Sequence, residues 1–134
     1  METQYTRPNW RIRLAERVRT ARLGIRPATI RCNESGLTTT VFHHDGSVST
    51  TRVKWSEVNG VVAYKRDAYI VDLVCVGFAT AEGTMEANEE MEGWGTLIDA
   101  LPVYLQGTPN PADWWNGVVH PPFAANPTTL FTSR

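Results

Sequence analysis

Short runs of apolar and hydroxyl-bearing residues follow one another along residues 28–90, and turn signals separate them. This alternation of apolar runs and turns constrains the fold more than any other feature. Each run is predicted to form a strand, and each turn joins two consecutive strands. Asp45-Gly46 suits a type I′ hairpin turn, and Asp67-Ala68 marks a second hairpin. The predicted strands cover residues 28–33, 37–44, 47–54, 61–66, 69–79 and 84–90. Six strands in succession predict an antiparallel meander, and the strand that is apolar on both faces, 69–79, should be central.

A helical period then replaces the strand pattern. Apolar residues recur three, four and seven positions apart, which predicts one stripe facing a core. The stripe consists of Trp94, Leu97, Ile98, Leu101 and Leu105. Pro102 should kink or shorten this helix near Leu101, and Gly107 should end it. Residues 28–107 are therefore predicted to form a sheet capped by one helix.

The segment 108–134 contains five of the eight prolines. Within it, Asn110, Pro111 and Asp113 have the residue types of the cap, first and third positions of a short helix. The segment is also rich in large apolar side chains, including two adjacent tryptophans. We therefore expect a proline- and tryptophan-rich tail that packs on the same domain.

Charge is divided unevenly along the chain. Residues 1–31 contain eight arginines against two acidic residues, a net charge of +6, whereas the rest contains five basic against twelve acidic residues, a net charge of −7. Residues 1–27 are predicted to form a basic amphipathic helical arm that ends near Gly24 and Pro27. Arginines border its apolar stripe on both sides, and these are Arg11, Arg13, Arg17 and Arg22.

Two interpretations of the arm remain open. Its stripe can pack on the acidic body of the same chain while the arginines make local ion pairs. Alternatively, the arm can lie on an anionic membrane or on nucleic acid through its four flanking arginines.

The strand-and-helix order is similar to the pleckstrin-homology-like architecture. Four segments resemble a family of small uncharacterised bacterial proteins: VVAYKRD (61–67), IVDLVC (70–75), EEMEGW (89–94) and PPFAANPTTL (121–130). The resemblance extends over residues 28–134. It implies an α+β fold in which a meander or partly open barrel of six to seven strands is capped by a C-terminal helix. It implies a scaffold role and brings no catalytic residues with it.

Motifs of catalysis and cofactor binding are missing from the sequence. It contains no Gly-x-Gly-x-x-Gly, phosphate-binding loop, His-Glu-x-x-His, Cys-x-x-Cys or Gly-x-Ser-x-Gly. His43 and His44 are neighbours on a strand, so their side chains should point to opposite faces and cannot easily hold one metal ion. We expect no catalytic residues, no metal and no cofactor.

Asp72 lies on a strand face that should bury Val74 and Val76. A carboxylate in that position is costly to desolvate unless it is paired. If Asp67-Ala68 forms a two-residue turn, Lys65 lies diagonally across the hairpin, within reach. The favoured interpretation is a buried Lys65–Asp72 ion pair, and the alternative is an acid with a raised pKa.

Acidic residues crowd the last predicted strand and the start of the helix. Helix-dipole stabilisation accounts for Glu92, but not for the whole group. The group could face the basic arm or a basic partner. The residues predicted to bind a partner are Glu86, Glu89, Glu90 and Glu92.

These features predict a non-enzymatic, cytoplasmic protein-binding module. One concrete form is an immunity or inhibitor protein that occludes a basic partner with its acidic body. The alternative is a protein that associates with membrane or nucleic acid through residues 1–26, and no small-molecule ligand is expected. Cys32 and Cys75 are predicted to be free thiols, as in a reducing compartment, and no apolar run reaches 18 residues.

Overall fold

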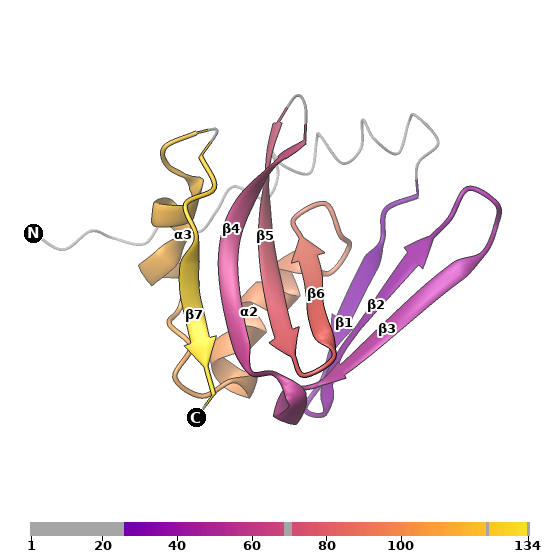
Figure 1. Cartoon of the computed structure of the whole chain (residues 1–134), viewed down its shortest axis with the longest axis horizontal. Helices are drawn as coiled ribbons and strands as arrows, with labels where there is room; N and C mark the ends of the chain where they lie inside the picture. The colour runs from indigo at the N-terminus through magenta and orange to yellow at the C-terminus, as the bar shows by residue number, and fades with distance from the viewer. Residues whose placement is uncertain (1–25, 69–70, 123, 134) are drawn as a thin grey trace, which may run out of the picture.

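The structure is a computed structural model that describes residues 26–68, 71–122 and 124–133. Within these residues the chain has an α+β fold of two antiparallel sheets and two α-helices (Figure 1). The elements in chain order are β1 (Thr29–Cys32), β2 (Gly36–Phe42), β3 (Val48–Lys54), the 3₁₀ turn η1 (Trp55–Glu57), β4 (Gly60–Ala68), β5 (Val71–Thr80), β6 (Gly83–Asn88), α2 (Trp94–Tyr104), α3 (Pro111–Val119) and β7 (Thr128–Thr132).

The strands do not continue as one meander. They form a three-stranded sheet in the order β1-β2-β3 and a four-stranded sheet in the order β6-β5-β4-β7, and these do not close into a barrel. The chain passes from the first sheet to the second at η1, where the Trp55 side chain is buried in the core. Strand β7 returns from beyond both helices and pairs with β4, so the predicted tail does pack on the domain.

Strand β5 is central, as its two-sided apolar pattern predicted. It lies between β4 and β6, and Val74, Cys75 and Val76 are fully buried. The predicted turn at Asp67-Ala68 is wrong, because the β4–β5 ladder continues to the pair Ala68–Val71. Because the hairpin is longer than predicted, each β4 residue pairs with a β5 residue an even number of positions from the predicted one. An even shift leaves every side chain on the face of the sheet where it was expected.

The β2–β3 turn also differs from the expected type I′ turn. That turn needs positive φ at both central residues. Here Gly46 has a positive φ of +87°, but Asp45 does not have a positive φ. The amide of Gly46 donates to the carbonyl of His43 at 3.1 Å, and Ser47 Oγ and N donate to the Asp45 carboxylate. The loop is therefore longer, and its one left-handed position is glycine.

Helix α2 buries the apolar stripe that the sequence indicated, and the short helix α3 predicted after Asn110 is present. Helix α2 contributes Trp94, Leu97, Ile98 and Leu101 to the core, all at most 1% exposed. It continues to Tyr104, beyond Pro102, and Leu105 N still donates to Leu101 O at 2.8 Å. Helix α3 begins at Pro111 and buries both of its tryptophans.

One short contact joins β1 to the chain that follows β6. Thr29 forms a parallel bridge with Glu92. Ile30 N donates to Glu92 O at 2.7 Å, and Glu92 N donates to Ala28 O at 2.9 Å. Gly93 follows directly with φ +97° and precedes α2. A Cβ atom at Gly93 would overlap the carbonyl oxygen of Ile30.

The predicted helical arm lies almost entirely outside the described residues, and so do Arg11, Arg13, Arg17 and Arg22. Among the residues that are described, no helix combines the length and the apolar character that crossing a membrane requires.

Gly93→Ala should destabilise the fold by roughly 3 kcal/mol, because left-handed backbone strain and overlap with Ile30 add together. Gly107→Ala is the matched control, since Gly107 has φ +95° and open space around it. It should cost only about 1 kcal/mol. Urea unfolding of both variants measures the difference, and equal losses would contradict the close contact at Gly93.

Candidate functional site

The four glutamates predicted to bind a partner differ in burial and in their contacts. Glu89 is 5% exposed, and its Oε1 accepts a hydrogen bond from the amide of Val74 at 3.0 Å. Glu86 lies on the outer face of the four-stranded sheet in an ion pair. Glu90 is half-buried and Glu92 is exposed. The structure therefore does not bring the four carboxylates together on one surface.

Glu86 is the centre of a polar network across β4, β5 and β6. Tyr64 Oη donates to Glu86 Oε2 at 2.7 Å, and Arg66 donates to Oε1 through Nη2 at 3.0 Å and Nε at 3.2 Å. A Cβ atom at Gly77 would lie 3.3 Å from Thr84 Cγ2 and 3.5 Å from the Tyr64 ring, so the ring packs over this glycine. Burial raises the pKa of Glu86, but hydrogen bonds from Tyr64 and Cys75 and the charge of Arg66 outweigh it and lower the pKa.

The same network keeps its two weak acids protonated. Burial, together with the Glu86 carboxylate, raises the pKa of Cys75 to about 12. Burial and the hydrogen bond to Glu86 also raise the pKa of Tyr64. A thiol in this state is a poor nucleophile at neutral pH. The network therefore stabilises the sheet and has no activated group.

The predicted Lys65–Asp72 ion pair is confirmed. Lys65 Nζ lies 3.1 Å from Asp72 Oδ2, with side chains 3% and 15% exposed. The ammonium also donates to the carbonyls of Val119 at 2.7 Å and Pro121 at 2.6 Å. The Lys65 amide donates to Ala125 O at 2.7 Å. Lys65 thus anchors the chain after α3 to the sheet.

The hairpin β2–β3 stands apart from the rest of the molecule (Figure 1). Strand β3 is an edge strand, and all of its residues except Val53 are exposed. Two hydrogen bonds at the ends of the β2–β3 ladder, from Trp55 N to Ser35 O and from His43 N to Ser47 O, show which residue pairs are hydrogen-bonded. Because paired residues alternate along an antiparallel ladder, the backbone groups of four β3 residues point away from β2. These are Val48, Thr50, Arg52 and Lys54.

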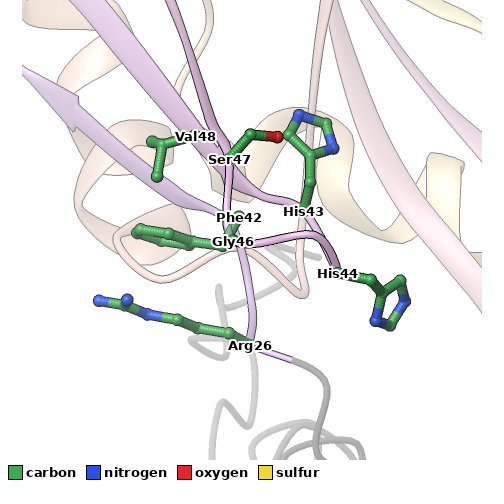
Figure 2. Close-up of a pocket in the computed structure, with 7 residues that line it drawn as sticks. All are labelled: Arg26, Phe42, His43, His44, Gly46, Ser47 and Val48. Carbon is green, nitrogen blue, oxygen red and sulfur yellow. The ribbon is translucent and has the colours of Figure 1, made fainter.

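Side chains of the same four residues lie on the outer face of this sheet, opposite the core side that Val53 shares with Leu37. A shallow depression of about 300 Å³ lies at the hairpin tip (Figure 2). In it the guanidinium carbon of Arg26 lies 3.7 Å from the centre of the Phe42 ring. His43 contacts Ser49 through Nε2 and Oγ at 2.6 Å, while His44 points away from Arg26.

This hairpin was predicted, but its exposed edge and outer face were not expected to form a candidate site, although the sequence contains a signal for them. Residues 36–54 contain one acidic residue, Asp45, and their strands contain runs of consecutive threonines where a buried strand would have apolar residues. Within the described ranges, no three His, Cys, Asp or Glu side chains are grouped so that they could hold a metal ion. Comparison with protein-family models, curated proteins and solved structures finds no match to the chain.

Glu86→Gln should lower stability at pH 7 by less than about 1 kcal/mol, since its ion pair is partly exposed. The pKa of Glu86 is lower in the folded protein than in the unfolded chain, so its contribution is present above about pH 4 and disappears as pH falls further. The difference from the parent protein should therefore shrink at pH 3. Glu82→Gln, at an exposed turn, is the control. A pH-independent difference in chemical denaturation would contradict this assignment.

Lys65→Met should destabilise the fold by about 3 kcal/mol, because it leaves buried carbonyls and a carboxylate without the ammonium. Arg66→Met is the control at the next position, where the side chain is 52% exposed, and should cost less than about 1 kcal/mol. Thermal unfolding distinguishes them. Similar losses would show that Lys65 does not anchor the tail.

Proposed function

We propose that this chain is a non-enzymatic protein-binding module that receives an extended segment of its partner along strand β3. The observation that supports it is the edge of β3, where alternate backbone N–H and C=O groups face away from β2. Such an edge is a template on which another strand can add, with backbone hydrogen bonds supplying affinity.

Access to the edge also supports the proposal. The hairpin reaches out from the body, so an added strand would meet few obstacles (Figure 1). No described backbone group pairs with the outer side of β3. Many proteins cover or shorten such edges, and a seven-residue exposed edge is therefore a candidate interface.

The buried polar groups support a binding role more than catalysis. Lys65 is engaged by three acceptors, Glu89 by a backbone amide, and Glu86 by Tyr64 and Arg66. Each of these three charged side chains therefore holds parts of the fold together.

An immunity or inhibitor role remains one form of this proposal. Glu92, which lies beside β1 at the opposite edge of the sheet, and the half-buried Glu90 would then face a basic partner. A pleckstrin-homology-like arrangement and a cytoplasmic location also belong to the proposal. Both described cysteines are free, which is usual in a reducing compartment.

Thr50→Pro tests the edge. Thr50 is exposed and its N–H points outward, so proline removes the donor needed by an added strand while sparing the β2 ladder. Tagged full-length protein with this change should lose, by at least tenfold, a partner that the parent retains from extracts of the source cells. Quantitative mass spectrometry of the bound proteins measures the loss.

Thr50→Ala is the matched control, since it removes the same side chain but keeps the N–H. It should retain the partner. If proline and alanine have the same effect, or if no protein depends on Thr50→Pro, strand addition at β3 is wrong. Circular dichroism confirms that both variants are folded.

A further inference from the structure

We infer that the outer face of the three-stranded sheet binds single-stranded nucleic acid. This goes beyond the proposed use of the β3 edge, because a face and an edge of one sheet present different groups. The edge offers backbone hydrogen bonds in the plane of the sheet, whereas the face offers side chains perpendicular to it.

Charge on this face has one sign. Strands β1, β2 and β3 contain three basic residues and no acidic residue. The alternation of the strands places all three basic residues, Arg31, Arg52 and Lys54, on the outer face, and all three are exposed. Exposed Arg26 adds a fourth cation at the hairpin end. Among described residues, Glu34 and Asp45 lie in the connections between the strands, Glu57 lines a depression with Arg52 and Lys54, and Glu92 lines one with Arg31.

The cations are arranged in rows with hydroxyl groups between them. Arg31, Thr38 and Arg52 are aligned across the three strands, so two guanidinium groups flank one threonine. The next row consists of threonines alone, Thr29, Thr40 and Thr50. Neighbouring strands are about 4.8 Å apart. A backbone of phosphates laid across the rows can therefore meet guanidinium, ammonium and hydroxyl donors in turn.

An aromatic group stands at the end of these rows. Phe42 pairs with Val48 on the same face, and the Arg26 guanidinium covers its ring at 3.7 Å (Figure 2). Unpaired bases stack on aromatic rings and on guanidinium planes. The Arg26–Phe42 stack thus offers a base-binding platform beside a phosphate-binding face.

Other anionic partners fit these features less well. A membrane surface needs cations but gains from apolar side chains that insert. On this face such side chains are limited to the Phe42–Val48 pair at one end, and the row beside it consists of threonines. An acidic protein would use the cations but has no need of the stack at Phe42. Single-stranded nucleic acid uses the cations, the hydroxyls and the stack.

Fluorescence anisotropy with a labelled oligothymidylate of about 20 nucleotides tests the inference on the full chain. The parent protein should bind with a Kd of about 1–100 µM at low salt. The triple variant R31Q/R52Q/K54Q should bind at least about tenfold more weakly. Its slope of log affinity against log salt should be less steep by about 2, as expected for the loss of three phosphate contacts on a single strand.

The matched control is R11Q/R13Q/R22Q, which removes the same number of positive charges from the arm. Its affinity should remain within about threefold of the parent. Equal weakening by the two triple variants, weakening by the arm variant alone, or no binding by the parent protein each overturns the inference.

Phe42→Leu separates nucleic acid from other polyanions. It should weaken oligothymidylate binding by about fivefold or more without changing the salt slope, because stacking does not release counterions. Unchanged affinity overturns the assignment. So does equal competition by poly-glutamate, which indicates an acidic protein, or binding only to phosphatidylserine vesicles, which indicates a membrane.

Discussion

The three-stranded sheet joins the rest of the fold through its inner face, where Ile30, Leu37 and Val53 enter the common core, and through one close backbone contact. Two backbone hydrogen bonds between β1 and Glu92 align it with the chain that enters α2. The approach is so close that the following residue must lack a side chain, and Gly93 meets this need. Trp55 supports the joint from the other side by stacking on Tyr104 at 5.3 Å between ring centres and donating to Asn33 O. The orientation of the exposed hairpin depends on these contacts.

Much of the architecture was readable from local patterns. The strand and helix positions were predicted within a few residues, because period-two and helical apolar spacing directly reflect burial. The Lys65–Asp72 pair was predicted correctly from an incorrect turn. In the structure Lys65 lies opposite Val74 and therefore diagonal to Asp72. Because the register shifted by an even number of residues, Lys65 and Asp72 stayed on the same face and remained diagonal neighbours. Local patterns could not reveal the return of β7 to β4, which depends on how the tail packs after two helices.

The candidate site was less predictable, since a cluster in the sequence need not be a cluster in space. Glu86 and Glu89 are three residues apart, yet one lies on the outer face and the other turns inward to bond a β5 amide. Side chains an odd number of positions apart on an extended chain point to opposite faces, so alternation itself separates these two carboxylates. Conversely, Arg31 and Arg52 are distant in the sequence but share one row of the sheet. Only the pairing of three strands brings them together.

The same residues of strand β3 form both the exposed edge of the sheet and part of its charged outer face. Arg52 and Lys54 direct their backbone groups outward and carry the cations of the outer face. If two copies met edge to edge, they would bring these like charges into neighbouring rows, which opposes such pairing. Repulsion between these charges therefore disfavours the pairing of β3 edges from two copies into a continuous ribbon.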